Sequence, residues 1–348
     1  MSTATVSGLA IDGWRKIMKR KLYILLLLFL FLPSLVSAKI VFRSRRDARG
    51  FGSIFVMDDD GSNVQRLTYP PNHNSNPAWS PDGKQIVFSK SIRVEDPKLG
   101  QRISLFIMDQ NGSNEHRLTN TPTLDSHAEW APDGQHIVFG STLSGDFEIH
   151  VININTGENQ QLTHSPDKAW AAGPSWSPNG KYIAYRYTLP ENGNTTIYVM
   201  NADGKNANPL IKGDRWTRFA PSWSPDSKSI LYFEATFRGF LLDTNNVVIQ
   251  EHKNRNRRRI LNIPRNWLVH AVAWADHGRQ VLICAEEWQV DDSQIDIYKY
   301  HLETNKIINL TNHPTEDLSP HWISDDVFHV TPLDKKRTQW GDVKENRP

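Results

Sequence analysis

The sequence predicts an all-β protein, a six-bladed β-propeller, and three observations lead to that prediction. Six tryptophans recur at intervals of 51, 46, 47, 51 and 48 residues, each inside a related heptapeptide. Short apolar runs follow most of these heptapeptides, and Asn-Gly or Asp-Gly turns occur at residues 60–61, 111–112 and 203–204. The first and last parts of the repeat array hold complementary pieces of one repeat. A period of about 40–50 residues built from short strands and turns is typical of propeller blades.

The tryptophan segment is the first strand of each repeat. Its clearest copy is Pro77-Ala-Trp79-Ser-Pro-Asp-Gly83, and the six repeat tryptophans are Trp79, Trp130, Trp176, Trp223, Trp274 and Trp322. Ser-Pro-Asp-Gly forms a tight turn, because Pro presets φ, Asp bonds its own backbone and Gly accepts positive φ. The next strand, such as Ile86–Phe88, is apolar without alternation. We therefore expect neighbouring blades to cover both faces of each sheet, with the tryptophans packed between blades.

Two further strands complete each repeat. Ser104–Met108 is a typical third strand, and Arg117-Leu-Thr119 is a short fourth strand. The Asn-Gly turn between them favours a hairpin, because a type I′ turn needs positive φ at both central residues. The fifth repeat departs from this pattern. Val247–Ile249 replaces the usual third strand, and we expect the basic run 252–259 to form the tip of a lengthened hairpin at the outer rim.

The two ends of the array predict one composite blade. Residues 39–68 supply the second, third and fourth strands without a tryptophan segment, whereas the Trp322 segment has no such strands after it. A blade made from both termini would close the ring and leave no open sheet edge. The run Val327–Val330 is an alternative second strand for this blade. The predicted propeller covers residues 39–332, and a polar tail covers 333–348.

The N-terminus predicts export. Residues 1–38 end in a basic stretch, an apolar run of 11 residues (Leu22–Leu32) and the small residues Val36-Ser-Ala38, which is the order of a signal peptide. We expect translation to begin at Met18, which gives a shorter signal peptide. In the alternative to cleavage, the segment stays attached as an uncleaved membrane anchor. The apolar run is too short to span a bilayer, which needs about 20 residues. No stable membrane span is predicted.

Charge and cysteine content narrow the function classes. Residues 1–38 hold five basic residues and one acidic residue, so the rest of the chain has 35 Lys and Arg against 37 Asp and Glu. Nothing in that balance favours nucleic-acid binding. Cys284 is the only cysteine, so no intramolecular disulfide can form. Its apolar surroundings predict a small buried side chain.

The phrase Trp-Ser-Pro-Asp-Gly-Lys, Ile-Val-Phe, Ile-Tyr-Val-Met-Asn, Asp-Gly and Leu-Thr resembles the TolB-type β-propeller repeat, a WD-repeat-like family, over about residues 40–330. The resemblance implies a six-bladed propeller in the periplasm or secreted from a bacterial cell. TolB-type proteins of the Tol system also carry an N-terminal α/β domain for partner binding. We expect that domain to be absent here, because the first propeller strand follows the predicted cleavage site closely. The role in the Tol system is therefore not carried over.

Related repeats also form the gating propellers of prolyl-oligopeptidase-type peptidases. Those enzymes need an α/β-hydrolase domain with a Gly-x-Ser-x-Gly turn, which this sequence lacks. The peptidase interpretation is therefore set aside.

In the family's layout, the loops from each fourth strand to the next first strand reach the mouth of the central channel. These loops are rich in tryptophan: Trp170, Trp216 and Trp267 lie six or seven residues before a repeat tryptophan. We expect an aromatic-walled mouth that stacks a sugar ring or a peptide side chain. In the alternative, these tryptophans only cap the blade ends. The predicted ligand-binding residues are Asn74, Asp125, His127, Trp170, Trp216, Arg218, Trp267, His270 and Asp317, with His73, Arg215 and Phe219 nearby.

Chemistry at the mouth is not assigned. No carboxylate pair or catalytic triad has a recognisable spacing. A cation held by His73, His127, His270 and Asp125 is an alternative without local spacing to support it, so no metal or cofactor is predicted. The predicted function is a non-catalytic, exported, monomeric propeller that binds an envelope or extracellular protein, or an oligosaccharide, at the channel mouth. The alternative is a carbohydrate-active enzyme of the polyuronide lyase kind with its site there.

Overall fold

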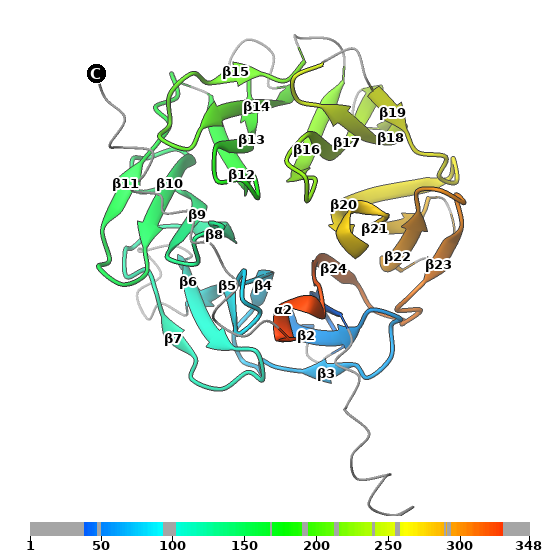
Figure 1. The fold of residues 1–348 in the computed structure, drawn as a ribbon, viewed down its shortest axis with the longest axis horizontal. Coiled ribbons are helices and arrows are strands. Elements are labelled where there is room, and N and C mark those ends of the chain that lie inside the picture. Colours follow the sequence, from blue (N-terminus) through cyan, green and yellow to red (C-terminus); the bar gives the residue numbers. More distant parts are fainter. Residues whose placement is uncertain are drawn as a thin grey trace, which may run out of the picture. The chain divides into compact units, whose positions relative to one another are not determined.

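The computed structural model describes residues 38–329, apart from 47–49, 93–101, 168, 190–193, 212–215, 239–240, 255–257, 289 and 291–293. The described residues form six four-stranded sheets placed around a common axis (Figure 1). The predicted six-bladed β-propeller is confirmed. The predicted signal peptide, except Ala38, and the predicted tail lie outside the described residues.

The blades are numbered here from the one that contains the first strand, and each strand pairs antiparallel with its neighbours. In order from the axis outward, blade 1 has β24 (Asp317–Ile323), β1 (Lys39–Ser44), β2 (Ser53–Asp58) and β3 (Gln65–Arg66). Blade 2 has β4 (Asn74–Trp79), β5 (Gln85–Ile92), β6 (Arg102–Asp109) and β7 (His116–Arg117). Blade 3 has β8 (Asp125–Trp130), β9 (His136–Ser141), β10 (Glu148–Asn153) and β11 (Asn159–Gln161).

The remaining three blades repeat this order. Blade 4 has β12 (Trp170–Trp176), β13 (Tyr182–Thr188), β14 (Thr195–Asn201) and β15 (Asn208–Pro209). Blade 5 has β16 (Thr217–Trp223), β17 (Ser229–Arg238), β18 (Leu241–Glu251) and β19 (Arg258–Ile260). Blade 6 has β20 (Trp267–Ala275), β21 (Gln280–Glu287), β22 (Asp296–His301) and β23 (Ile307–Asn309), with a 3-10 turn, η2 (Asp276–Gly278), between β20 and β21. A short helix, α2 (Asp326–His329), follows β24.

Blade 1 combines strands from opposite ends of the described chain. β24 pairs antiparallel with β1, and Trp322 lies opposite Ile40 in the register. The alternative in which residues 327–330 take the second strand position is wrong, because residues 326–329 form α2 and β1 already pairs with β24 and β2. In Figure 1 the last strand lies beside the blue strands of the first residues.

The core lies between the blades, as the apolar second strands predict. Trp176 is 3% exposed and packs in a cluster that joins Val138 and Ile149 of blade 3 to Ile183 and Met200 of blade 4. Clusters of the same kind hold the other repeat tryptophans. Cys284 is buried in one of them, and burial raises the pKa of its thiol. Interlocked sheets of this kind are stabilised mainly by apolar burial.

The Leu-Thr phrase of the repeat has a structural reason. After the short fourth strand, a threonine Oγ1 accepts a hydrogen bond from the backbone N–H of the third strand. The pairs are Thr68 with Ile54 (2.8 Å), Thr119 with Leu105 (3.0 Å), Thr163 with Ile149 (2.8 Å) and Thr311 with Ile297 (3.0 Å). The hydroxyl thus satisfies a buried N–H beyond the end of the ladder. Each outer edge can therefore be only two or three residues long, which limits edge-to-edge association.

Blade 5 carries the departure seen in the sequence. β17 and β18 contain 10 and 11 residues, and the basic run lies between β18 and the outermost strand β19. One member of that run, Arg258, forms an ion pair with Glu234 of β17. Arg259 of the same run donates to the carbonyl oxygen of Leu302 in blade 6, so the end of the basic run, which lies in β19, is held by two arginine contacts.

Candidate functional site: the central channel

The channel contains a cavity of about 210 Å³ that the six innermost strands line. Each blade contributes a short segment of its first strand. The contributing residues include Asn76, His127, Gly173, Ala220, His270 and Ser319. A site lined by all six blades exists only in the closed ring, so it depends on the correct assembly of every sheet.

Backbone irregularities occur at the same level of the channel in every blade. The register between the innermost strand and its neighbour shifts near these residues in all six sheets. Asn76, His127, Ala220 and Ser319 have positive φ, between 49° and 54°, although they are not glycines. A bulge re-aims the side chains of a strand and is common next to binding sites. The left-handed backbone at four non-glycine positions therefore marks this level as locally strained.

Two of the nine predicted ligand-binding residues, His127 and His270, line this cavity. His127 is exposed to the channel, but protein surrounds the channel at its level. That setting, with Arg186 nearby, lowers the pKa of His127 to about 4. The His270 Nε2 atom lies 2.9 Å from the Glu286 Oε1 atom. At neutral pH His127 is thus an uncharged donor and acceptor in the channel wall.

Three predicted polar residues lie at the starts of innermost strands and are buried. Asp125 accepts hydrogen bonds from Ser141 (2.6 Å), Thr123 (3.0 Å) and Thr121 (3.2 Å). Asn74 donates to the carbonyl oxygen of Asn72 at 3.2 Å. These contacts anchor the loop that leads into each strand, a usual use of Asn, Asp and Thr in turns.

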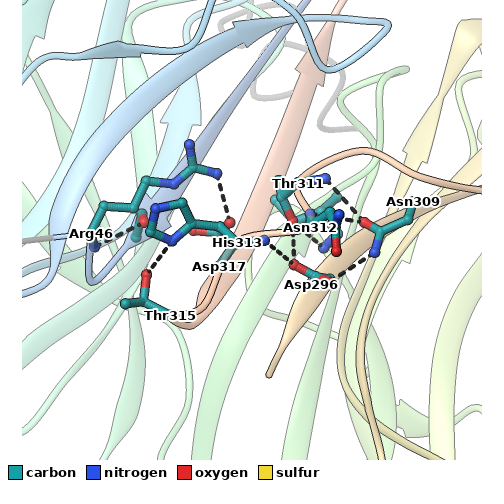
Figure 2. A network of polar contacts seen from close by, with 10 residues as sticks. Arg46, Asp296, Asn309, Thr311, Asn312, His313, Thr315 and Asp317 are labelled. Atoms are coloured by element: carbon teal, nitrogen blue, oxygen red, sulfur yellow. Dashed lines mark hydrogen bonds and ion pairs between the residues drawn. The ribbon is translucent and has the colours of Figure 1, made fainter. Parts of the chain in front are cut away.

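Figure 2 shows the same arrangement where blade 6 meets blade 1. Asp296 accepts from the Thr311 hydroxyl at 2.9 Å and from the His313 backbone N–H at 3.2 Å. Asp317, the third of the predicted polar residues, is fully buried and forms an ion pair with Arg46 at 2.9 Å. Each carboxylate at this junction thus bonds within its own side: Asp296 to the loop that leaves blade 6, and Asp317 to Arg46 of blade 1.

The three predicted tryptophans lie at the mouth, but neighbouring side chains cover a ring face of Trp170 and of Trp267. The ring of Trp267 packs against Tyr298, with ring centroids 4.2 Å apart, and the side chain is buried. The guanidinium of Arg186 lies 4.5 Å from the ring centroid of Trp170. Trp216 is half-buried. The stacking surface offered to a ligand is therefore smaller than the sequence indicates.

The other predicted and nearby residues lie as follows. Arg218 is 2% exposed, and its Nε lies 3.4 Å from Glu234 Oε2 inside blade 5. His73 Nδ1 accepts a hydrogen bond from the backbone N–H of Gly52 at 3.0 Å. Burial lowers the pKa of His73, and the nearby charges of Arg43 and Arg45 lower it further. Phe219 stacks on Phe233 with centroids 5.0 Å apart. Arg215 lies outside the described residues.

Sequence reasoning missed two channel residues, Glu129 and His321. Both line the channel cavity and a second cavity of about 450 Å³, so they lie where the two meet. Their positions immediately precede a repeat tryptophan, where the other repeats have alanine or serine. That departure from small residues was the available signal.

Glu129 and His321 also connect neighbouring blades. His321 Nδ1 accepts a hydrogen bond from the backbone N–H of Trp79 at 3.3 Å. Glu129 interacts with the backbone N–H of Trp176 and with the Ser175 hydroxyl, which lies 3.5 Å from its Oε1. Burial in the channel wall raises the pKa of Glu129 to about 8 and lowers the pKa of His321 to about 4. Both side chains are therefore mostly uncharged at neutral pH.

The pKa of Glu129 predicts a pH-dependent stability. In the unfolded chain this carboxyl ionises near 4.5, but in the folded state it does so at about 8. Between these values the folded state holds a proton that the unfolded state has released, so stability falls as pH rises. Glu129→Gln should remove this fall. We expect the variant to match the wild type near about pH 4.5 and to exceed it by about 2 kcal/mol at about pH 8, because channel water reduces the full effect of the shift.

Urea unfolding at both pH values tests this prediction. The exposed Glu158 supplies the matched control, since Glu158→Gln changes the same charge away from the channel. An equal decline with pH in wild type and Glu129→Gln would contradict the assigned ionisation.

The second cavity lies at the other end of the innermost strands. Its lining includes the repeat tryptophans Trp79, Trp130, Trp176 and Trp322, together with Val327 of α2. The sequence assigns these tryptophans to packing between blades, and the structure shows that they also form the wall of this cavity. A large aromatic side chain can do both, because one edge packs in the core while another borders the cavity.

Two findings concern ions and membranes. Within the described ranges, no group of three or more His, Cys, Asp or Glu side chains is placed to hold a metal ion. No helix in that part of the chain is long and apolar enough to cross a membrane.

Part of the repeat array matches a known protein family. Residues 94–197 match the model of the TolB beta propeller domain. The chain is similar to the Tol-Pal system protein TolB of Francisella tularensis subsp. mediasiatica (strain FSC147), with 32% identity over 119 residues. That match covers 33% of this chain and 26% of the relative, so it spans about a quarter of the relative's length.

Solved structures show the same fold. TolB from Acinetobacter baumannii superposes with a TM-score of 0.66 at 19% identity, over 83% of this chain and 67% of that one. A chain of the Kuenenia stuttgartiensis hydrazine synthase gives a TM-score of 0.66 at 13% identity, over 83% and 47% of the two chains. Likeness at such identity shows the fold alone, because one fold serves many functions. The superpositions show the six-bladed β-propeller fold, and the TolB beta propeller model matches the chain over residues 94–197.

Proposed function

We propose that this protein is an exported, non-catalytic, monomeric β-propeller that binds a protein partner at the channel mouth. The proposed signal peptide covers residues 1–38, the propeller covers 39–332, and the working compartment is the periplasm or the outside of a bacterial cell. The basic, apolar and small-residue segments of the N-terminus support export. N-terminal sequencing of the exported protein tests the cleavage site.

The observation that carries the proposal is the position of exposed apolar side chains. In an antiparallel four-stranded blade, the loop between the second and third strands and the loop that leads to the next blade emerge at the same end. Tyr69, Leu143, Trp288 and Val290 are exposed, and all four lie on such loops, at the mouth end of the channel. Large apolar residues exposed around one opening favour protein contact.

The covered aromatic faces favour a protein over an oligosaccharide. Sugar recognition commonly uses an open aromatic face, whereas Trp170 is in contact with Arg186 and Trp267 with Tyr298. Tyr69, by contrast, is 67% exposed. Amphipathic aromatic residues of this kind are enriched in protein interfaces.

Site-specific photo-crosslinking tests the proposal. A photoreactive phenylalanine replaces Tyr69 at the mouth end or, as a matched control, Val64 in the β2–β3 turn at the opposite end of the same blade. We expect a protein adduct from position 69 and none from position 64 when the protein is expressed in its own envelope. Equal adducts from both positions, or none from position 69, would refute the proposal.

A further inference from the structure

Arg186 is a half-buried cation that forms no ion pair with any of the residues the structure describes. It lies on β13, and its Nε is buried without a hydrogen-bond acceptor. No carboxylate of the described residues lies within ion-pair distance of its guanidinium, and its recorded contacts are with aromatic rings. Removing a charge from water is costly unless a counter-charge replaces the water. The site therefore has one positive charge in excess.

Other buried arginines near the mouth differ in this respect. Arg43 pairs with Glu316 at 2.6 Å, Arg46 with Asp317 at 2.9 Å, and Arg218 with Glu234. The chain thus supplies carboxylates for three arginines at this end. Burial lowers the pKa of Arg186, with no neighbouring acid to oppose the shift.

Two aromatic rings hold the guanidinium in place. Its carbon lies 4.5 Å from the ring centroid of Trp170 and 5.8 Å from that of Phe219 in the next blade. Cation–π contacts orient a guanidinium but leave its N–H groups free to donate. The fork of a guanidinium matches the two oxygens of a carboxylate, which it can bind through two parallel hydrogen bonds.

The position connects Arg186 to the channel. Ala220, the residue after Phe219, lines the channel cavity, and so does His127, whose protonation Arg186 disfavours. An anion that reached Arg186 from the mouth would thus lie near an uncharged imidazole able to accept or donate a hydrogen bond. Trp170, Arg186, Phe219 and His127 come from three blades and meet at one side of the mouth.

We propose that Arg186 binds a carboxylate of an acidic peptide segment at the channel mouth, with Trp170 and Phe219 as positioning residues. This inference rests on the proposed function and names the chemistry of the partner. A peptide is favoured over a uronic-acid sugar because Arg186 itself contacts Trp170 and Tyr298 packs against Trp267, which leaves little aromatic surface for a sugar ring.

Calorimetric titration with a short oligoglutamate peptide tests the proposal at low salt. We expect the wild-type protein to bind oligoglutamate but not oligoglutamine, and Arg186→Gln to weaken binding at least about tenfold. Arg186→Lys keeps the charge but loses the fork, so it should give an intermediate loss. The control is Arg279→Gln, an exposed arginine in an A–B turn that lies away from the mouth, and it should bind as the wild type does.

A thermal melt separates binding from folding. Because Arg186 has no carboxylate partner among the described residues and its burial is costly, we expect Arg186→Gln to melt at or above the wild-type temperature, even though it loses the contacts with Trp170 and Phe219. An arginine needed for folding would lower the melting temperature when replaced. Unchanged oligoglutamate affinity in Arg186→Gln, equal binding of oligoglutamine, or no binding by the wild type would overturn the proposal. Arg186-dependent binding of oligogalacturonate alone would also overturn it and would assign the site to a sugar acid. Crosslinking from position 69 is independent of Arg186, so the proposed function can survive this failure.

Discussion

Trp176→Ala is expected to lower the free energy of unfolding by about 3–5 kcal/mol. The indole is 3% exposed and joins the cores of blades 3 and 4, and its Nε1 donates to the carbonyl oxygen of Gly180 at 3.3 Å. Truncation would remove this packing and extend the second cavity, which the indole borders. Flanking sheets cannot close the space without moving a whole blade.

Urea denaturation measures the effect, and Trp288→Ala is the matched control. Trp288 is 38% exposed on the β21–β22 loop, so its loss should change stability by no more than about 0.5 kcal/mol. A similar cost for both substitutions would show that the repeat tryptophans do not hold the blades together.

Glu234→Ala is expected to destabilise the protein by about 3–5 kcal/mol. The carboxylate is fully buried in blade 5 and pairs with Arg218 on one side and Arg258 on the other. Asn246 donates a hydrogen bond to Glu234 Oε1, the atom that pairs with Arg258, at 3.2 Å. Removing the carboxylate would take away the negative charge that Glu234 supplies to the buried Arg218, which is much more costly than removing one partner of an exposed pair.

A compensating variant sharpens this test. Replacing Glu234 and its more buried partner by apolar residues, as in Arg218→Met with Glu234→Leu, should recover much of the loss, since neither fully buried charge remains and Arg258 is 33% exposed to water. Lys228→Ala removes one partner of an exposed pair with Asp226 and should cost at most about 1 kcal/mol. If Glu234→Ala cost as little as Lys228→Ala, the buried network would have no structural importance.

The fold could be predicted from the sequence because its signals are local. Ser-Pro-Asp-Gly or a close variant after the first four repeat tryptophans specifies a turn, and the apolar second strands specify burial on both faces. The composite blade followed from counting which strands each end of the array lacks. The alternative strand at residues 327–330 stayed open because four residues of mixed character can form either a strand or one helical turn.

The site was harder to predict because burial and pairing depend on neighbouring blades. His127 and His270 line the cavity as expected, but Asp125, Asn74 and Asp317 are buried and each bonds to groups of the protein, namely threonine and serine hydroxyls, a backbone carbonyl and an arginine. Arg186 lies within a strand, and its aromatic contacts come partly from the next blade, so no local pattern marks it. Glu129 was detectable in principle, as a charged residue where sister repeats have alanine or serine.

The pairing of β1 with β24 imposes an order on biogenesis. In the ring, the strand β1, which is synthesised first, pairs with β24, which is synthesised last. The inner edge of β1 can therefore form its hydrogen bonds only after almost the whole described chain has been made. Contacts between residues so distant along the chain form slowly, and an unpaired strand edge attracts other chains meanwhile. A protein of this design therefore spends its synthesis as an incomplete arc, when holdase chaperones would have the most to protect.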